Sequence, residues 1–212
     1  MKCKKIIATA VAAVLGLGPA AWAHEDHSKH MEQMQGASRA PGTVQVRLAD
    51  AALVTQDGKS VNFKSDVVGG HIVIMDFVYT TCTTVCPVVS GIFAQLQDRL
   101  GDRLGKDVRL VSVTVDPVRD TPQRLKAYAA KVNAGPHWTW LTGPTTTVNQ
   151  VLQGLGTYTP DFTQHPSVVL VGDGTTGKWT RFYGFPDPDQ ILARINELVQ
   201  ARGAHAGHGH KG

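Results

Sequence analysis

Two cysteines separated by three residues, Cys82 and Cys86, have the residue type and the spacing to do chemistry. They lie between an apolar, strand-like run and an apolar run with helical spacing that begins at Pro87. The start of a helix carries partial positive charge and unpaired N–H groups, both of which stabilise thiolates. Thiolates there can exchange disulfides or bind a soft metal ion such as Cu(I). A structural disulfide is the weaker interpretation, because so short a loop removes little entropy from the unfolded chain.

The spacing of the cysteines distinguishes these functions only in part. C-x-x-C is typical of thiol–disulfide exchange. C-x-x-x-C instead places the thiols nearly one helical turn apart, and both thiols lie on the same side of the helix if residue 82 is close to its start. That arrangement favours two sulfur ligands on one metal and does not exclude a disulfide. His165 is the candidate third ligand, because it precedes a strand expected beside the cysteine loop in a thioredoxin-like sheet. Pro166 is a candidate cis proline packed against the cysteines.

Asp116 directly follows a predicted β-branched strand at residues 108–115. Site residues collect at the ends of parallel strands in α/β folds. We therefore expect Asp116 to act beside the metal ligands, by hydrogen bonding or through its charge. A turn and helix-capping role is the alternative, although Asp120 and Thr121 could fill that role in its place.

Histidines are concentrated near both ends of the chain. Clusters this dense in an exported protein indicate weak accessory metal capture, and a solvated role without binding is the open alternative. These histidines are His24, His27, His30, His205, His208 and His210.

Residues 1–23 are predicted to be a secretory signal peptide, with a basic start, an apolar run and an A-x-A cleavage site at residues 21–23. Cleavage would remove three lysines, so that the formal net charge falls from +4 to +1, and we expect no nucleic-acid partner. It would also remove Cys3, which leaves Cys82 and Cys86 as the only thiols. The predicted location is the periplasm, an oxidising compartment. An uncleaved membrane anchor is the alternative to a protein free of the membrane.

The rest of the chain divides into three segments. A His- and Met-containing leader at 24–42 and a Gly/His tail at 203–212 are too polar to fold alone, and the folded domain covers 43–202. Within it, strands and helices alternate, which together with an N-terminal hairpin predicts an α/β sandwich of thioredoxin type, its central mixed sheet flanked by helices. The predicted strands are 44–48, 52–55, 60–63, 72–78, 108–115, 167–171 and 179–183, and the predicted helices cover 87–100, 121–132, 145–155 and 188–201.

The sequence resembles the Sco/SenC family of copper-binding, thioredoxin-like proteins from about Val44 to Val199. The segments that carry the resemblance are Asp76-Phe77-Val78-Tyr79-Thr80-Thr81-Cys82, Val85-Cys86-Pro87, Val111-Ser112-Val113-Thr114-Val115-Asp116-Pro117, Asp120-Thr121-Pro122 and His165. The resemblance implies copper binding by Cys82, Cys86 and His165, with Asp116 at the position of the family's aspartate. It also implies delivery of copper to cytochrome c oxidase. The sequence departs from many members in having Thr83 instead of Pro, Gln164 instead of Asp, and Pro166 instead of a non-proline residue.

Three functions are consistent with these features. The main hypothesis is a periplasmic copper metallochaperone, not an enzyme, which holds Cu(I), or alternatively Cu(II), and passes it to an acceptor such as an oxidase subunit. It requires a thiol reductant protein as a second partner, because a disulfide offers no thiolate. The alternatives are a thiol–disulfide oxidoreductase that reduces the cysteines of a copper acceptor, and a copper buffer whose histidine-rich ends bind most of the metal.

Overall fold

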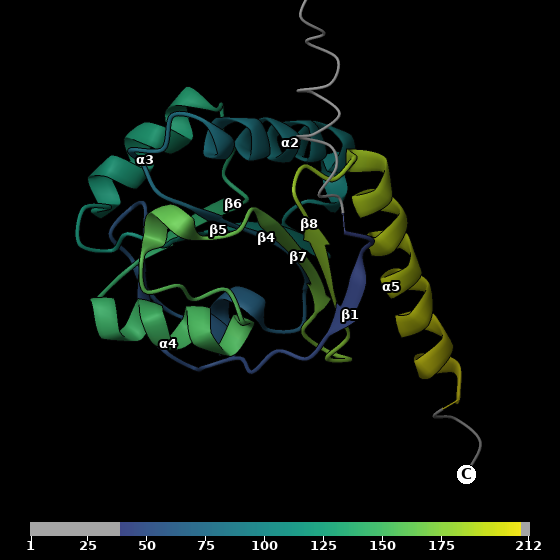
Figure 1. Ribbon diagram of the computed structural model, residues 1–212. Helices are drawn as coiled ribbons and strands as arrows, with labels where there is room; N and C mark the ends of the chain where they lie inside the picture. The colour runs from purple at the N-terminus through teal and green to yellow at the C-terminus, as the bar shows by residue number, and fades with distance from the viewer. Residues whose placement is uncertain (1–38, 209–212) are drawn as a thin grey trace, which may run out of the picture. The chain divides into compact units, whose positions relative to one another are not determined.

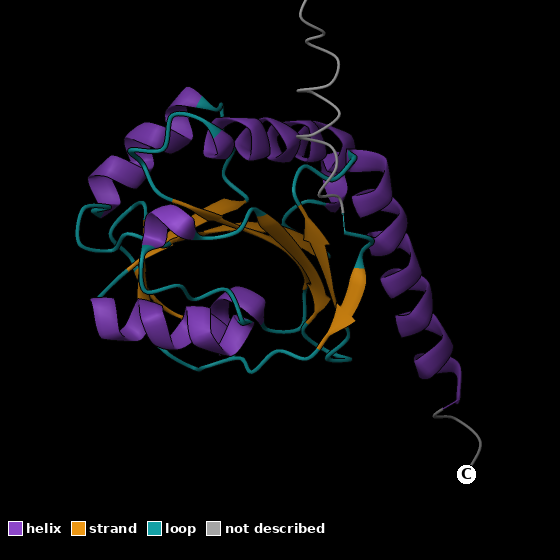
Figure 2. Ribbon diagram, viewed as in Figure 1, coloured by secondary structure: helices purple, strands orange, loops and turns teal. Residues whose placement is uncertain are grey.

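The computed structural model describes residues 39–208, with side chains as far as Gly203. The strands of this part form one mixed sheet in the order β1-β8-β7-β4-β5-β6-β2-β3. The strands are β1 (Gly42–Val44), β2 (Ala52–Thr55), β3 (Ser60–Asn62), β4 (Ile72–Val78), β5 (Val108–Thr114), β6 (Trp138–Thr142), β7 (Val168–Asp173) and β8 (Trp179–Tyr183). Four α-helices flank this sheet in the described part (Figures 1 and 2), which confirms the predicted thioredoxin-like α/β class.

The sheet separates two apolar layers. Helices α2 (Val85–Leu100), α3 (Pro122–Lys131) and α5 (Pro188–His208) pack on one face, and α4 (Thr145–Leu155) packs on the other (Figure 1). Three short helical turns complete the described elements: η1 (Phe63–Val68), η2 (Gly101–Arg103) and η3 (Phe162–Gln164). The antiparallel pair of β2 and β3 is the predicted N-terminal hairpin, and it forms one edge of the sheet.

The central strands β4 and β5 are parallel, and their register runs from Ile72 opposite Val108 to Val78 opposite Thr114. All seven residues of β4 are buried, as expected for a strand covered by helices on both faces. Because the strands are parallel and in this register, they end at the same edge of the sheet. The antiparallel strand β7 begins at that edge. The connections that follow β4 and β5 and precede β7 therefore meet there.

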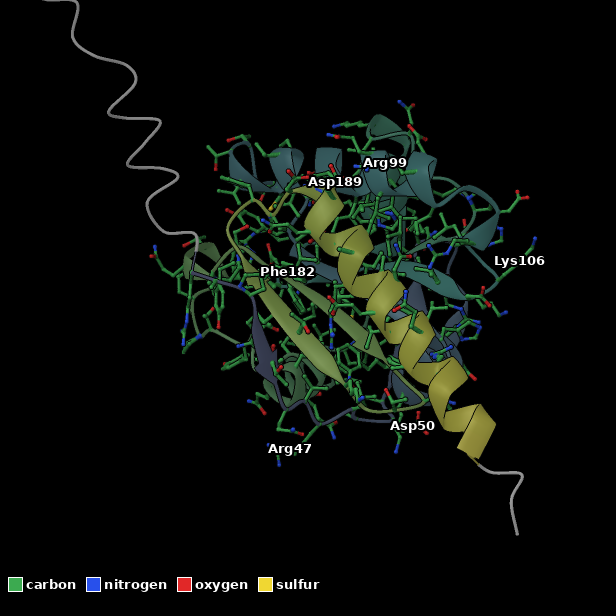
Figure 3. The ribbon with its side chains drawn as sticks, turned by 90° about the vertical axis from the view of Figure 1, so that its right-hand side faces the viewer. Arg47, Asp50, Arg99, Lys106, Phe182 and Asp189 are labelled. Carbon is green, nitrogen blue, oxygen red and sulfur yellow. The ribbon has the colours of Figure 1, made fainter. Side chains whose placement is uncertain are left out.

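Helix α5 is tied to the rest of the fold at both ends. Arg99 of α2 pairs with Asp189 in the first turn of α5, and Figure 3 shows the two side chains together. This pair is exposed and stabilises little. Arg202 donates to the fully buried carboxylate of Asp173 at the end of β7, at 2.6 Å from Nη2 to Oδ1. Breaking that pair would leave a buried charge alone, so it matters more to stability.

Several element boundaries differ from those that the sequence predicts. β1 covers Gly42–Val44 instead of 44–48, because it pairs with β8 from Gly42 onward. β6 was not predicted, although Trp138-Thr139-Trp140 alternates as a strand does; both tryptophans are buried in the apolar layer that α2 and α3 cover. α5 continues to His208 and not only to residue 201, in a segment that Arg202 holds to Asp173 and that is rich in alanine.

Two further expectations concern the backbone and the membrane. The prediction of a cis Pro166 was wrong, because residues 39–208 contain no cis peptide bond. The signal peptide at 1–23 and the leader up to residue 38 lie outside the described part of the chain. Among the residues that are described, no helix combines the length and apolar character that a membrane crossing requires.

Asp76 is a fully buried carboxyl group in the middle of the sheet. Its Oδ1 accepts a hydrogen bond from Ser112 Oγ at 2.5 Å, and Ser112 Oγ in turn accepts from Trp138 Nε1. No group in the described part of the chain pairs with Oδ2. Burial raises the pKa of Asp76 to about 7, and the hydrogen bond from Ser112 offsets only part of that rise.

Asp76 should therefore make stability depend on pH. Between pH 4 and pH 7 the folded chain keeps a proton on Asp76 that the unfolded chain has released, so the free energy of unfolding falls as pH rises. Relative to wild type, Asp76→Asn should gain on the order of a few kcal/mol between pH 5 and pH 8, because that variant has no proton to lose. Urea unfolding at both pH values measures this difference. Asp173→Asn is the control and should show no such gain, since the pKa of Asp173 is lowered overall; an equal gain in both variants would contradict the assignment to Asp76.

Candidate metal and thiol site

The loop Tyr79–Thr84 connects β4 to α2 and carries the first cysteine. Both Cys82 and Cys86 are buried, free thiols. The backbone N–H of Cys86 donates to Cys82 Sγ at 3.3 Å, whereas the N-cap residue Thr84 makes no side-chain capping bond. The sulfur of Cys82 thus takes the capping place at the start of α2, as the sequence predicts for thiols at a helix N-terminus.

The two thiols differ in acidity. Burial alone would raise the pKa of Cys82, but hydrogen bonds from the Cys86 thiol, from the backbone of Cys86 and Thr84, and from the Tyr79 hydroxyl outweigh it and lower the pKa to about 7. Burial raises the pKa of Cys86 far above that of an ordinary thiol, and its hydrogen bond to Cys82 raises it further. Near neutral pH the pair therefore consists of one partly ionised sulfur and one protonated sulfur that donates to it.

Tyr79 lies between Cys82 and His165. Its hydroxyl is hydrogen-bonded to Cys82, and burial followed by this bond raises the pKa of Tyr79 to about 12. The ring contacts Phe162 edge to face at 5.1 Å between centroids, and His165 at 5.9 Å. Tyr79 is thus the side chain through which the cysteine loop meets the histidine loop. No local pattern in the sequence predicted this position.

His165 follows η3 and is half-buried. Its Nδ1 lies 2.9 Å from the carbonyl oxygen of Phe162, and its Nε2 lies 3.1 Å from that of Phe77. Both partners are acceptors, so a neutral imidazole, with one N–H, satisfies only one of them. Among the side chains that the structure describes, which end at residue 203, no three of His, Cys, Asp or Glu are gathered as a ready metal site. The fold brings the two thiols together and places His165 near them, but with both ring nitrogens facing backbone carbonyls.

Asp116 and Asp120 have different surroundings at the end of β5. Asp116 is buried and accepts from Arg119 Nη1 at 3.0 Å. Asp120 instead accepts from Thr80 of the cysteine loop and from Thr114. Asp120 is the aspartate that reaches the cysteine loop, a contact that its predicted place as a helix cap did not indicate. The proposed role of Asp116 beside the metal ligands stays a prediction.

The histidines at the chain ends lie mostly beyond the part that the structure describes. His24, His27, His30 and His210 fall outside residues 39–208. His205 and His208 fall in the last turns of α5, beyond the described side chains. Accessory metal capture by these six residues stays a prediction.

The fold and the dithiol at a helix start define a thioredoxin-like protein whose two thiols can exchange disulfides or bind a metal ion. Residues 47–200 match the family described as SCO1/SenC. That match covers well over half of the chain, so the protein belongs to the SCO1/SenC family, as its resemblance indicated.

Individual relatives share parts of this chain. The SCO1 protein homolog of Bacillus subtilis is 38% identical over 89 residues, which are 42% of this chain and 45% of that protein. The SCO1 homolog 1 of Arabidopsis thaliana mitochondria is 28% identical over 140 residues, 63% of this chain and 41% of that protein. The chain thus spans less than half the length of these curated relatives.

Solved structures match over a larger share. BsSco, described as a Sco-family cytochrome c oxidase assembly protein with a disulfide switch, is 25% identical with a TM-score of 0.62, covering 74% of this chain and 95% of that one. Arabidopsis thaliana ScoI with copper bound is 26% identical with a TM-score of 0.58, covering 72% of this chain and 99% of that one.

The acidity of Cys82 should be visible in its alkylation. In the reduced protein, iodoacetamide should modify Cys82 at a rate that rises through a midpoint near pH 7, because only the thiolate reacts, while Cys86 stays unmodified. Tyr79→Phe removes one hydrogen-bond donor and should move the midpoint up by roughly half a unit. Peptide mass spectrometry after timed alkylation measures both sites separately. Tyr158→Phe, at an exposed tyrosine, is the control. A wild-type midpoint near that of a free cysteine, about 8.5, would contradict the hydrogen-bond assignment.

Proposed function

We propose that this protein is a periplasmic copper metallochaperone that holds Cu(I) with the thiolates of Cys82 and Cys86 and the imidazole of His165, and delivers it to a copper site of a respiratory oxidase. The observation that carries the proposal is the buried thiol pair at the start of α2, with His165 brought beside it through Tyr79. Copper-bound ScoI and the oxidase-assembly description of BsSco support the choice of metal and client.

The donor set suits Cu(I). Thiolate sulfur is a soft ligand, and imidazole binds copper well. One thiol already ionises near neutral pH, and the second, held against it, has to lose its proton when the metal binds. Burial excludes water from the sulfurs, and the helix start supplies N–H groups that stabilise their negative charge.

His165 has to turn before it can serve as the third ligand. Its Nε2 must leave the carbonyl of Phe77, or its Nδ1 the carbonyl of Phe162, because a ligating nitrogen needs a free lone pair. The nitrogen that stays on its carbonyl would donate to it and fix the ring, as in many metal sites. Because the nitrogen of His165 can return from the metal to its carbonyl, the same movement allows release of the metal to an acceptor.

Copper titration tests the proposal. The reduced protein, titrated with Cu(I) against a competing chelator, should bind one ion tightly. Cys82→Ser and Cys86→Ser should each lose most of that affinity, because one soft ligand is gone, and His165→Ala should weaken binding by at least about tenfold. The competition curve yields each dissociation constant.

Matched variants sharpen the test. His137→Ala, at an exposed histidine, should leave the affinity unchanged. Alanine in place of His24, His27, His30, His205, His208 and His210 should leave the tight site in place if the histidines near the chain ends are accessory. An affinity of His165→Ala equal to that of His137→Ala would exclude His165 as a ligand.

A thiol–disulfide oxidoreductase is the second candidate, and the asymmetry of the two thiols favours it. The thiolate of Cys82 would attack one sulfur of a partner disulfide and expel the other as a thiol. Cys86, after losing its proton, would then attack the sulfur of Cys82 and release the second partner thiol, so that two electrons pass to the partner and a Cys82–Cys86 disulfide forms.

This second candidate makes a different prediction for the same variants. Reduction of a disulfide-bonded peptide should survive His165→Ala, and Cys86→Ser should trap a mixed disulfide on Cys82 because the resolving thiol is missing. Mass spectrometry of the quenched reaction detects the trapped species. Failure of the reduced wild-type protein to reduce the peptide would count against this function and leave the copper proposal standing.

A further inference from the structure

Asp120 has a buried carboxylate that binds the cysteine loop. It is 1% exposed, and it accepts from three donors. The backbone N–H of Thr80 lies 3.1 and 3.2 Å from Oδ1 and Oδ2, the hydroxyl of Thr80 donates to Oδ1 at 2.5 Å, and the hydroxyl of Thr114 donates to Oδ2 at 2.7 Å. Bonds to an ionised acceptor are stronger than those between neutral groups. The carboxylate therefore joins the loop after β4 to the end of β5.

Helix capping does not explain this arrangement. Asp120 precedes α3, but the N-cap of α3 is Thr121, whose Oγ1 accepts from the backbone N–H of Arg124. The neighbouring aspartate, Asp116, pairs with Arg119. The carboxylate of Asp120 thus turns away from its own helix toward a loop that lies 40 residues earlier in the chain.

Apart from the bonds that the Cys82 sulfur accepts, few polar contacts hold the cysteine loop. Within the loop, the N–H of Cys82 donates to the carbonyl of Tyr79. The N-cap residue Thr84 contributes no side-chain bond, and Thr81 and Thr83 are exposed. Thr80 is two residues before Cys82, so fixing its backbone and its hydroxyl removes most of the freedom of the segment that leads to the first thiol.

We propose that Asp120 is a positioning residue for the cysteine pair: its bonds to Thr80 hold Cys82 at the distance from Cys86 that the two thiols need to act as a unit. This deepens the proposed function, because both a bidentate thiolate ligand set and an internal disulfide require two sulfurs held at high effective concentration. Cys86 is fixed by α2, and Cys82 lies in the loop before it. The Cys82 sulfur already accepts the N–H of Cys86, and Asp120 adds a restraint on the loop backbone two residues earlier.

The direct test compares the thiol pair in wild type and in Asp120→Ala. Each protein is equilibrated with mixtures of reduced and oxidised glutathione, in which one oxidised glutathione and the two thiols give the protein disulfide and two reduced glutathiones. Asp120→Ala should lower this equilibrium constant by roughly tenfold, through lost effective concentration. Its Cu(I) affinity should fall by a similar factor. Asp120→Asn, whose amide can still accept from Thr80 and donate to Thr114, should restore most of both values.

Matched controls separate positioning from general destabilisation. Asp173 is an equally buried carboxylate at the opposite end of the sheet from the thiols. Asp173→Ala should lower the free energy of unfolding at least as much as Asp120→Ala and leave the glutathione equilibrium unchanged. Thr80→Val, which deletes one donor, should lower the equilibrium constant several-fold, whereas Thr83→Val, in the same loop but exposed, should not.

The outcomes decide the proposal even if one variant fails to fold. If Asp120→Ala does not fold, the glutathione equilibrium constants of Thr80→Val and Thr83→Val are compared instead, and only Thr80→Val should show a lower constant. An unchanged constant in Asp120→Ala or in Thr80→Val, or an equal fall in Asp173→Ala, would overturn the positioning role. A wild-type protein that binds no Cu(I) refutes the copper proposal alone, since the glutathione equilibrium still measures what Asp120 does to the thiols.

Discussion

The parallel pairing of β4 with β5 is the constraint on which the site depends. Their register brings Val78 and Thr114 to the same edge, so the cysteine loop and the loop of Asp116 and Asp120 begin side by side. Adjacent parallel strands require a crossover, which α2 supplies, and the start of α2 thereby faces that edge. The position of the thiols thus follows from the sheet, and the chemistry of the thiols follows from the helix.

The helix start then makes the two sulfurs unequal. Cys82 accepts hydrogen bonds from N–H groups and a hydroxyl, so its charged form is favoured. Cys86 lies in the first turn of α2, where burial dominates. A pair of thiols with different pKa values suits both proposed functions. The Cys82 thiolate can bind the metal ion or attack a disulfide first, and Cys86 then loses its proton and reacts second. A third metal ligand is needed for copper binding but not for disulfide exchange, so the role of His165 distinguishes the two proposed functions. Its ring lies beside Tyr79, and both ring nitrogens face backbone carbonyl oxygens.

Local features of the site could be predicted from the sequence, and long-range ones could not. Pro87 and the apolar spacing after it are local signals, and they placed Cys82 and Cys86 at a helix start, as the structure confirms. The orientation of His165 depends on the carbonyl of Phe77, 88 residues away, and no local pattern reports it. Strands with strong β-branched runs, such as β4, were predicted to the residue, whereas β6 is short and has no β-branched apolar run, so it was missed despite its alternating tryptophans.

Two of the buried aspartates, Asp76 and Asp120, show why residue type alone does not give a role. Asp76 lies within β4, where the backbone N–H groups are used by neighbouring strands, and its carboxyl is bound by Ser112 alone. A single donor does not compensate for burial, so the pKa of Asp76 rises to about 7 and the carboxyl group costs stability where it lies. Asp120 lies just beyond β5, where the chain has left the sheet and free donors exist. It collects three of them, two from the loop that carries Cys82. Whether a buried carboxylate is stabilised by hydrogen bonds therefore depends on where it lies along its strand. At the end of a strand, unlike within it, N–H and hydroxyl groups of the neighbouring loops can donate to the carboxylate, and these loops form the site.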